Sequence, residues 1–377
     1  MADRELLRTT LRLHLAEGVG ALTFRRLVEA FGSVEKVLAG RPAQWRRVDG
    51  VGEKVCRGIE SVTDEDVDAE LSLAAERGVE ILAAGDERFP AALKTIYDCP
   101  PVLYVRGRLE RADAVAVGIV GARRCTYYGL EQGERFGQLL GRAGFTVVSG
   151  GARGIDAAAH RGALAVGART IAVMGCGLCQ TYPRENAGLF EQILADGRGA
   201  VVSELPMRTG IRAGNFHSRN RIISGLSLGV LVVEAARRSG TLITAREAVE
   251  QGRPVFAIPG RIDSPMSEGT NDLIRKGVTL VGRLDDILDE LGEVGEAMAE
   301  PEPSESDVID AAVTDEAERK CVDALRGGAM AIDELARRTG LDSARVAASM
   351  TLLAIKGLVA QQPGQVFALK KREVRRD

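Results

Sequence analysis

The sequence predicts an α/β protein whose central domain, residues 86–291, is a doubly wound and mostly parallel sheet. Seven apolar runs of mostly four to seven residues alternate there with helical segments; they are AVAVGIVGA, FTVVSGG, TIAVMG, AVVSE, LGVLVVEA, PVFAIPG and VTLVG. Their hydrophobicity is continuous rather than alternating, which is typical of strands covered by helices on both faces. In such a sheet, ligands bind at the carboxyl ends of the strands.

Size and composition indicate a soluble globular protein. The chain has 377 residues, of which 45% are hydrophobic and 4% aromatic, enough for two or three domains. No window approaches the roughly 18 uninterrupted apolar residues of a membrane span, and the first residues, MADRELLRTT, lack the apolar segment of a signal peptide. We therefore expect a cytoplasmic protein with no membrane partner. Six scattered cysteines agree with a reducing compartment.

Residues 1–85 read as a small helical domain. It contains two similar turns, EGVG and DGVG, and each is followed by a helix-compatible segment. This pair resembles helix-hairpin-helix or SAM-like units, in which the glycine turn offers backbone amides to a nucleic-acid phosphate. The alternative is a compact helical pair with no ligand.

The central domain is followed by an acidic linker at 292–315, a small domain at 316–370 and a basic tail at 371–377. Three helical segments and two short strands around a Pro-Gly turn predict a winged helix. Its presumed recognition helix carries only two cations, Arg345 and Lys356, which argues against sequence-specific reading of DNA. Residues 285–318 hold 14 acids and no base, leaving 39 acidic against 50 basic residues elsewhere. A polyanionic partner is therefore compatible with the overall charge of -3.

The segment SGGARGIDAAAH, residues 149–160, closes one apolar run and opens a helix through a glycine turn. Glycines allow a ligand to approach the backbone, and the first amides of the helix face an anion. The spacing is GGxxG rather than GxGxxG, and no acid ends the next run, TIAVMG, so a dinucleotide is not expected. The chain also lacks GxxxxGK[ST], which excludes a P-loop ATPase. We expect phosphate binding and no cofactor.

Basic and polar side chains gather where the predicted strands end. Seven arginines and a single acid, Glu234, lie between residues 207 and 246. A guanidinium group can bind two oxygens of one phosphate at once. Arginines from several strand ends would therefore form a groove for a polyphosphate or a nucleic acid. The alternative is a surface of arginines paired with neighbouring helices. The candidate binding residues are Gly121, Arg123, Ser149, Gly150, Gly151, Arg153, Gly154, Arg184, Asn186, Arg219, Asn220, Arg221, Ser239 and Gly240.

Catalytic and metal sites are weakly supported. Asp156 and His160 are one helical turn apart and could act as an acid and base, but a helix-capping role for the aspartate is favoured. Cys176 and Cys179 form a lone CxxC without a second pair of ligands, so zinc or redox chemistry is not expected. We predict no catalytic residue and no metal.

The motifs VGARR, SGGARGIDAAAHRGAL, YPREN, FHSRNRIISGLS, SGTLITAREA, AIPG and GTNDLIRKGVTLV occur in this order between about residues 90 and 282. They closely resemble the DNA-processing protein A family, also called DprA or Smf. The resemblance implies an extended Rossmann-like fold, often with an N-terminal helix-hairpin-helix or SAM-like domain and sometimes a C-terminal winged helix. It also implies a non-enzymatic homodimer that binds single-stranded DNA, protects incoming DNA and loads the RecA recombinase onto it in natural transformation.

In that family, the single-stranded DNA lies in a basic pocket at the carboxyl edge of the sheet. By resemblance, Arg123 matches the arginine of the first turn, and the glycine turn contributes Gly150, Gly151, Arg153 and Gly154. Arg184 stands where a lysine is frequent, which keeps the charge but changes the hydrogen-bond geometry. The rest of the groove would comprise Asn186, Arg219, Asn220, Arg221, Ser239 and Gly240.

Two other function classes share single features with this sequence. Nucleoside-monophosphate phosphoribohydrolases of the LOG type share the fold, but their signature resembles PGGxGTxxE with a catalytic glutamate. Here SGTLITA has Thr244 or Ala245 at that place, although Glu247 is near. A winged-helix transcription regulator is the third class, and the few base-reading groups argue against it.

Overall fold

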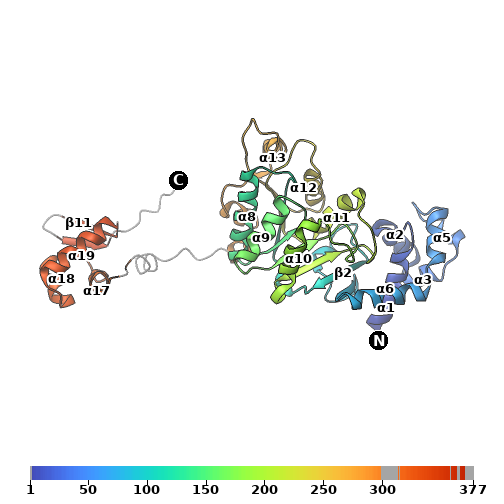
Figure 1. The fold of residues 1–377 in the computed structure, drawn as a ribbon, viewed down its shortest axis with the longest axis horizontal. Coiled ribbons are helices and arrows are strands. Elements are labelled where there is room, and N and C mark those ends of the chain that lie inside the picture. Colours follow the sequence, from blue (N-terminus) through green and yellow to red (C-terminus); the bar gives the residue numbers. More distant parts are fainter. Residues whose placement is uncertain (1, 299–312, 314, 357, 363–365, 370–377) are drawn as a thin grey trace. The chain divides into compact units, whose positions relative to one another are not determined.

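The computed structural model describes residues 2–298, 313, 315–356, 358–362 and 366–369. It divides into two compact units, residues 1–299 and 300–377, which are described separately (Figure 1). The basic tail and most of the predicted acidic linker lie outside the described residues. None of the described helices combines the length and the apolarity that a bilayer span needs.

Nine strands of the described residues form one sheet, in the order β1-β2-β6-β5-β4-β3-β7-β8-β9. Neighbouring strands from β6 to β9 run parallel, whereas β2 is antiparallel to both β1 and β6. The mostly parallel sheet is therefore confirmed. The strands are β1 (Val79–Ala83), β2 (Val102–Gly107), β3 (Ala116–Val120), β4 (Thr146–Ser149), β5 (Thr170–Val173), β6 (Gly199–Ser203), β7 (Gly229–Val232), β8 (Val255–Ala257) and β9 (Thr279–Leu280).

Strand β1 differs from the sequence prediction, which assigned residues 1–85 to helices. The segment VEILA is too short to show a clear period, and four of its five side chains are buried. It pairs with β2 in register from Val79 opposite Arg106 to Ala83 opposite Val102. The paired residues are 19 to 27 positions apart in sequence, so a local pattern does not reveal the pairing.

Helices cover both faces of the sheet. On one face α8 (Tyr127–Arg142), α9 (Ile155–Ala165) and α10 (Ala187–Leu194) lie side by side (Figure 1). A Cβ at Gly137 of α8 would lie 2.4 Å from the Ala159 carbonyl oxygen, so the glycines of α8 allow its backbone to touch α9. The other face packs against α7 (Ala91–Lys94), α11 (Ala213–Gly225) and α12 (Thr241–Glu250). Short helices follow at α13 (Glu268–Arg275), α14 (Asp285–Glu290) and α15 (Glu293–Met298).

The N-terminal helices contain the two predicted glycine turns, and both turns have the same backbone geometry. They are α1 (Ala2–Leu15), α2 (Ala21–Phe31), α3 (Val34–Leu38), α4 (Pro42–Trp45), α5 (Glu53–Ser61) and α6 (Asp64–Glu76). The first glycine of each turn has a positive φ, 88° at Gly18 and 80° at Gly50. The second glycine is the N-cap of α2 or α5. Ion pairs of 2.8 Å between Lys54 and Glu17 and 2.9 Å between Arg26 and Asp49 join the turns.

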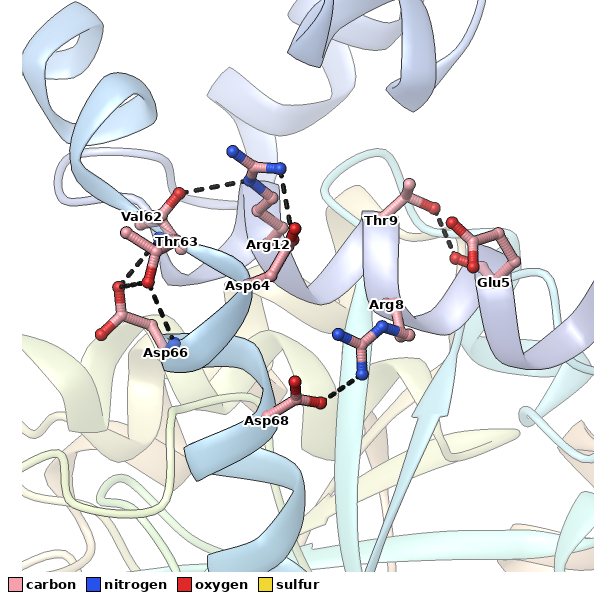
Figure 2. A network of polar contacts seen from close by, with 9 residues as sticks. All are labelled: Glu5, Arg8, Thr9, Arg12, Val62, Thr63, Asp64, Asp66 and Asp68. Atoms are coloured by element: carbon pink, nitrogen blue, oxygen red, sulfur yellow. Dashed lines mark hydrogen bonds and ion pairs between the residues drawn. The ribbon is translucent and has the colours of Figure 1, made fainter.

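Polar contacts fasten α1 to α6, as Figure 2 shows. Arg12 donates through Nε to the Val62 carbonyl oxygen at 3.2 Å and pairs with Asp64, and Arg8 pairs with Asp68. Helix α6 also contacts the sheet domain, because the Met207 amide donates to Glu70 at 2.7 Å. The N-terminal helices and strands β1 and β2 share one apolar cluster, so the helical region and the sheet form one compact unit.

The C-terminal unit is a winged helix. Its elements are α17 (Glu316–Leu325), α18 (Ile332–Thr339), α19 (Ser343–Ile355), β10 (Met330–Ala331), β11 (Val359–Gln362) and β12 (Val366–Leu369). The strands pair in the order β10-β12-β11. Lys356, one of the two cations of the presumed recognition helix, is 2.6 Å from the buried Glu318 carboxylate. Of these two cations, Arg345 alone is exposed with no carboxylate within ion-pair distance among the described residues, which strengthens the case against base reading.

Candidate nucleic-acid interface

A pocket of about 520 Å³ lies at the carboxyl ends of β3 and β7. The loop after β3 supplies Gly121 and Arg123, helix α11 supplies Arg219 and Asn220, and the loop after β7 supplies Ser239 and Gly240. These six predicted residues are thus brought together, as expected for the carboxyl edge of a doubly wound sheet.

The glycines of the turn after β4 are needed for packing inside the protein. A Cβ at Gly150 would lie 2.3 Å from Nη1 of Arg219, and a Cβ at Gly154 would lie 2.4 Å from the Ala122 carbonyl oxygen. Gly151 and Gly154 also have positive φ values of 61° and 76°. The turn therefore makes room for a guanidinium group and for the loop after β3.

Arg219 lines the pocket and is almost completely buried, with 4% of its surface exposed. Its Nη1 donates to the Val173 carbonyl oxygen, while its Nε has no hydrogen-bond partner among the described residues. Burial lowers the pKa of the Arg219 guanidinium to about 10, and the neighbouring Asp156 carboxylate opposes this effect. The group stays charged at neutral pH, so the pocket holds a positive charge in its wall.

Asp156 and His160 have different partners, although they are one turn apart on α9. The Asp156 carboxylate accepts from the Ala152 amide at 3.3 Å and lines the pocket. Burial raises its pKa, and Arg219 lowers it. His160 Nδ1 lies 2.7 Å from Thr170 Oγ1, and burial lowers the pKa of His160 to about 3. The aspartate braces the glycine turn, and no hydrogen bond joins it to the histidine in the described structure.

The rim of the pocket combines a cation with aromatic rings. The Arg123 guanidinium lies 5.1 Å from the ring centre of Phe216, and the Phe216 and Tyr182 rings are 5.3 Å apart. Arg123 is exposed and Phe216 is half-buried, so a base or a phosphate can reach both. Phe190, a third aromatic residue nearby, is buried against Gly151 instead.

Arg221 does not belong to the pocket. Its guanidinium pairs with the carboxylates of Asp98, at 2.8 Å, and Glu204, and it is 5% exposed. Successive residues of an α-helix point about 100° apart, so Arg219, Asn220 and Arg221 cannot all face one side. The sequence prediction placed all three in the groove, and for Arg221 the structure gives an ion-pairing role.

Four further predicted residues lie around the glycine turn rather than in the pocket wall. The Ser149 hydroxyl is buried and donates to the Ile119 carbonyl oxygen at 2.5 Å. Asn186 is buried and donates to the carbonyl oxygens of Gly151 and Ala152 at 2.9 and 3.2 Å. Arg153 and Arg184 are exposed, and Arg153 pairs with Glu185. The turn is thus held by Ser149 and Asn186, while the two arginines remain on the surface.

The sequence analysis missed several pocket residues. Ala213, Phe216, His217 and Ile223 line the pocket and follow the helical spacing of the predicted Asn220 along α11, so this period would have found His217. Met266 comes from a distant loop, and no local signal marks it. Among the described residues, no group of three histidine, cysteine or carboxylate side chains could hold a metal ion. Burial raises the pKa of Cys176 to about 11, so its thiol is not activated.

Comparisons with known proteins agree with this architecture. Residues 80–292 match the family model for DNA recombination-mediator protein A, residues 4–72 match the DprA-like N-terminal HHH domain, and residues 299–365 match the DprA winged helix domain. Protein Smf of Escherichia coli is 47% identical over 211 residues, which is 56% of each chain, so the match spans about half of that relative. Protein Smf of Synechocystis is 35% identical over 93% of this chain and 96% of its own.

Two solved structures have similar folds. DNA processing protein A (DprA) of Streptococcus pneumoniae has a TM-score of 0.65 and 33% identity, covering 74% of this chain and 96% of its own. DNA processing protein A of Helicobacter pylori, a protein with a single-stranded DNA binding mode, has a TM-score of 0.51 and 31% identity, covering 56% of this chain and 95% of its own. This chain belongs to the DNA recombination-mediator protein A family, also named DprA or Smf.

Proposed function

We propose that this protein binds single-stranded DNA along the carboxyl edge of its sheet, with one nucleotide entering the pocket. The observation that carries the proposal is that one pocket combines two features: a buried cation in its wall, Arg219, and the contact of Arg123 with the Phe216 ring at its rim. Cations attract the phosphates and an aromatic ring stacks on a base, a combination that suits a strand whose bases are unpaired. The similar DNA processing protein A of Helicobacter pylori binds single-stranded DNA, which supports the same ligand here.

The proposed contact set follows the geometry of the described residues. Gly121, Arg123, Arg219, Asn220, Ser239 and Gly240 would contact the strand directly, because they line the pocket. Exposed Arg153 and Arg184 would attract phosphates outside it. Ser149, Gly150, Gly151, Gly154 and Asn186 would act by holding the turn, and Arg221 is left out.

The decisive experiment is a fluorescence-anisotropy titration of a labelled single strand and its duplex at several salt concentrations. We expect the single strand to bind more tightly than the duplex. In a plot of the logarithm of the binding constant against the logarithm of the salt concentration, the slope should be about -0.7 for each phosphate contacted. Equal affinity for both forms of DNA would contradict the proposal.

We further propose that the protein works in the cytoplasm as a homodimer that protects incoming DNA and loads RecA onto it in transformation or recombination. The family membership supports this role. A strand-exchange assay with a single-strand-binding protein on the DNA tests it, because a loader shortens the lag before RecA filaments form. An unchanged lag would count against RecA loading without affecting the binding proposal. Sedimentation of the free protein tests the dimer.

We also propose that the protein is not an enzyme. Thr244 lines the pocket at the position where a LOG-type hydrolase needs its glutamate, and Glu247 is absent from the pocket wall and lies near Asp98. The carboxylate that does line the pocket, Asp156, accepts a hydrogen bond from the Ala152 amide of the glycine turn, and none stands at the position where the hydrolase stabilises the developing sugar cation. Release of free base from AMP in a chromatographic assay would contradict this proposal.

A further inference from the structure

A second exposed surface lies at the same edge of the sheet and has no role in the proposed function so far. Tyr127, the first residue of α8, is 83% exposed, and Ile262 is 97% exposed. Large apolar side chains so fully in water are common singly, so their neighbours decide whether they matter.

The backbone that carries Tyr127 is firmly held. The Thr126 amide and hydroxyl donate to the Glu234 carboxylate at 2.9 and 2.6 Å, and the Ala122 amide donates to the Glu234 carbonyl oxygen at 2.9 Å. On the other side, the Tyr128 hydroxyl donates to the Pro259 carbonyl oxygen at 3.1 Å. The ring of Tyr127 is therefore displayed from a rigid support, which reduces the entropy lost when a ligand stacks on it.

A hollow of about 660 Å³ lies beside this ring, lined by Tyr127, Tyr128, Arg261 and Ser264 among others. The hollow lies next to the first pocket, because the loop between β3 and α8 and the loop before α13 contribute residues to both. Arg124 and Met266 line the first pocket, and Thr126 and Ser267 line this hollow. A polymer that leaves the pocket on the β8 side would cross this hollow next.

The charge of this side favours a polyanion. Arg124, Arg237 and Arg238 are exposed, and none of them has a carboxylate within ion-pair distance among the described residues. Glu234, which the sequence places among these arginines, is buried and bonded to Thr126. It also lines the hollow, but both of its carboxylate oxygens accept hydrogen bonds from Thr126.

We propose that the surface formed by Arg124, Tyr127, Arg237 and Arg238 is a second contact for single-stranded DNA, in which one base stacks on the Tyr127 ring. This inference rests on the proposed function and adds the direction in which the strand leaves the pocket. The arginines bind the phosphates on either side of the stacked base. A neutral protein partner would not require three cations without a carboxylate partner on the loops after β3 and β7, beside an exposed aromatic ring.

The test uses the full chain and a 20-residue deoxythymidine strand. Tyr127→Ala is expected to lower the affinity about 5- to 150-fold, the range for losing one stacked base. Tyr127→Phe keeps the ring and should retain the native affinity within about twofold. Tyr97→Ala, which removes another exposed tyrosine far from the pocket in sequence, is the control and should bind as the native protein does.

A spectroscopic readout separates stacking from a general loss of structure. In Tyr127→Trp, the indole fluorescence should be quenched when the strand is added, whereas the buried Trp45 gives a constant background. Absence of quenching, or native affinity in Tyr127→Ala while Arg123→Ala is impaired, would overturn the inference and leave the proposed function standing. If the native protein itself fails to bind the strand, the proposed function fails. A change in the sedimenting mass of free Tyr127→Ala would assign the surface to a second copy instead and overturn the inference.

Discussion

The two sides of helix α11 hold arginines that are equally buried but differently surrounded. Arg221 is paired with two carboxylates, Asp98 and Glu204. Arg219 has no carboxylate within ion-pair distance among the described residues and lines the pocket instead. A buried charge is stable only if it is paired or hydrogen-bonded. The difference teaches that the place of the countercharge, rather than burial, separates a structural arginine from one available to an anionic ligand.

The strongest way to break this comparison is to remove Arg221. Arg221→Met should lower the free energy of unfolding by about 3–5 kcal/mol, because it leaves the buried Glu204 carboxylate and the half-buried Asp98 carboxylate without their partner. Urea denaturation measures this loss, and the protein that remains folded should bind single-stranded DNA as before. Unchanged stability would show that the ion pairs contribute nothing.

The matched variant Arg219→Met should have the opposite profile. We expect an affinity for single-stranded DNA about 10- to 100-fold lower, the value of one charge-assisted hydrogen bond to phosphate, with a smaller loss of stability. The same titration and the same urea series serve both variants. Similar profiles for the two arginines would refute the distinction between the sides of α11.

Gly150→Ala tests whether the glycine turn acts by giving Arg219 room. The new Cβ would lie 2.3 Å from Nη1 of a buried guanidinium, so we expect about 1–3 kcal/mol lower stability and about tenfold weaker binding. Gly188→Ala is the control, because a Cβ there has no atom within 4 Å and a helical alanine is favourable. Equal behaviour of the two variants would mean that the turn tolerates a side chain.

Arg123→Ala examines the rim rather than the wall of the pocket. Loss of an exposed cation and its stacking on Phe216 should weaken binding about 5- to 10-fold and reduce the salt slope by about 0.7. Arg246, exposed on α12 and outside the pocket, supplies the control Arg246→Ala. A salt slope that does not change would show that Arg123 does not contact a phosphate.

A smaller effect concerns pH and the support of the turn. Burial lowers the pKa of His160 to about 3, below its usual 6.5, so the unfolded chain binds a proton more readily. The contribution of the neutral His160 ring to the stability of the folded protein is therefore complete above about pH 6.5 and is lost as the pH falls towards 3. His160→Gln should flatten the stability profile in this window, as urea denaturation at each pH would measure. Part of the pH dependence of stability should remain in this variant, because burial also lowers the pKa of His14, to about 4.

The smallest expected effect is that of the C-terminal unit. Deleting residues 300–377, which cluster apart from residues 1–299, should change the affinity for single-stranded DNA less than about threefold, since the pocket lies wholly in the first unit. Anisotropy on the shortened chain checks this. A collapse of affinity would move the main binding surface to the winged helix.

The sequence alone determined the layer architecture and the edge of the sheet at which ligand groups gather. Continuous apolar runs report burial on both faces, and residues that follow parallel strands must meet at one edge. That reasoning predicted the strands from β3 to β9, the winged helix, and the pocket residues Gly121, Arg123, Arg219 and Asn220. These features depend on local period and chain order, which the sequence states directly.

Only the tertiary structure decided which of the predicted side chains face the pocket. Arg219 and Arg221 are alike in sequence, but Asp98 and Glu204, which neutralise one of them, arrive from distant segments. Gly150 looked like a ligand contact, whereas the neighbouring guanidinium explains its lack of a side chain. Strand β1 likewise depends on a partner that lies beyond its own segment. Contacts between residues far apart in the chain set the local dielectric, the countercharge and the free space, and none of these can be read from local spacing.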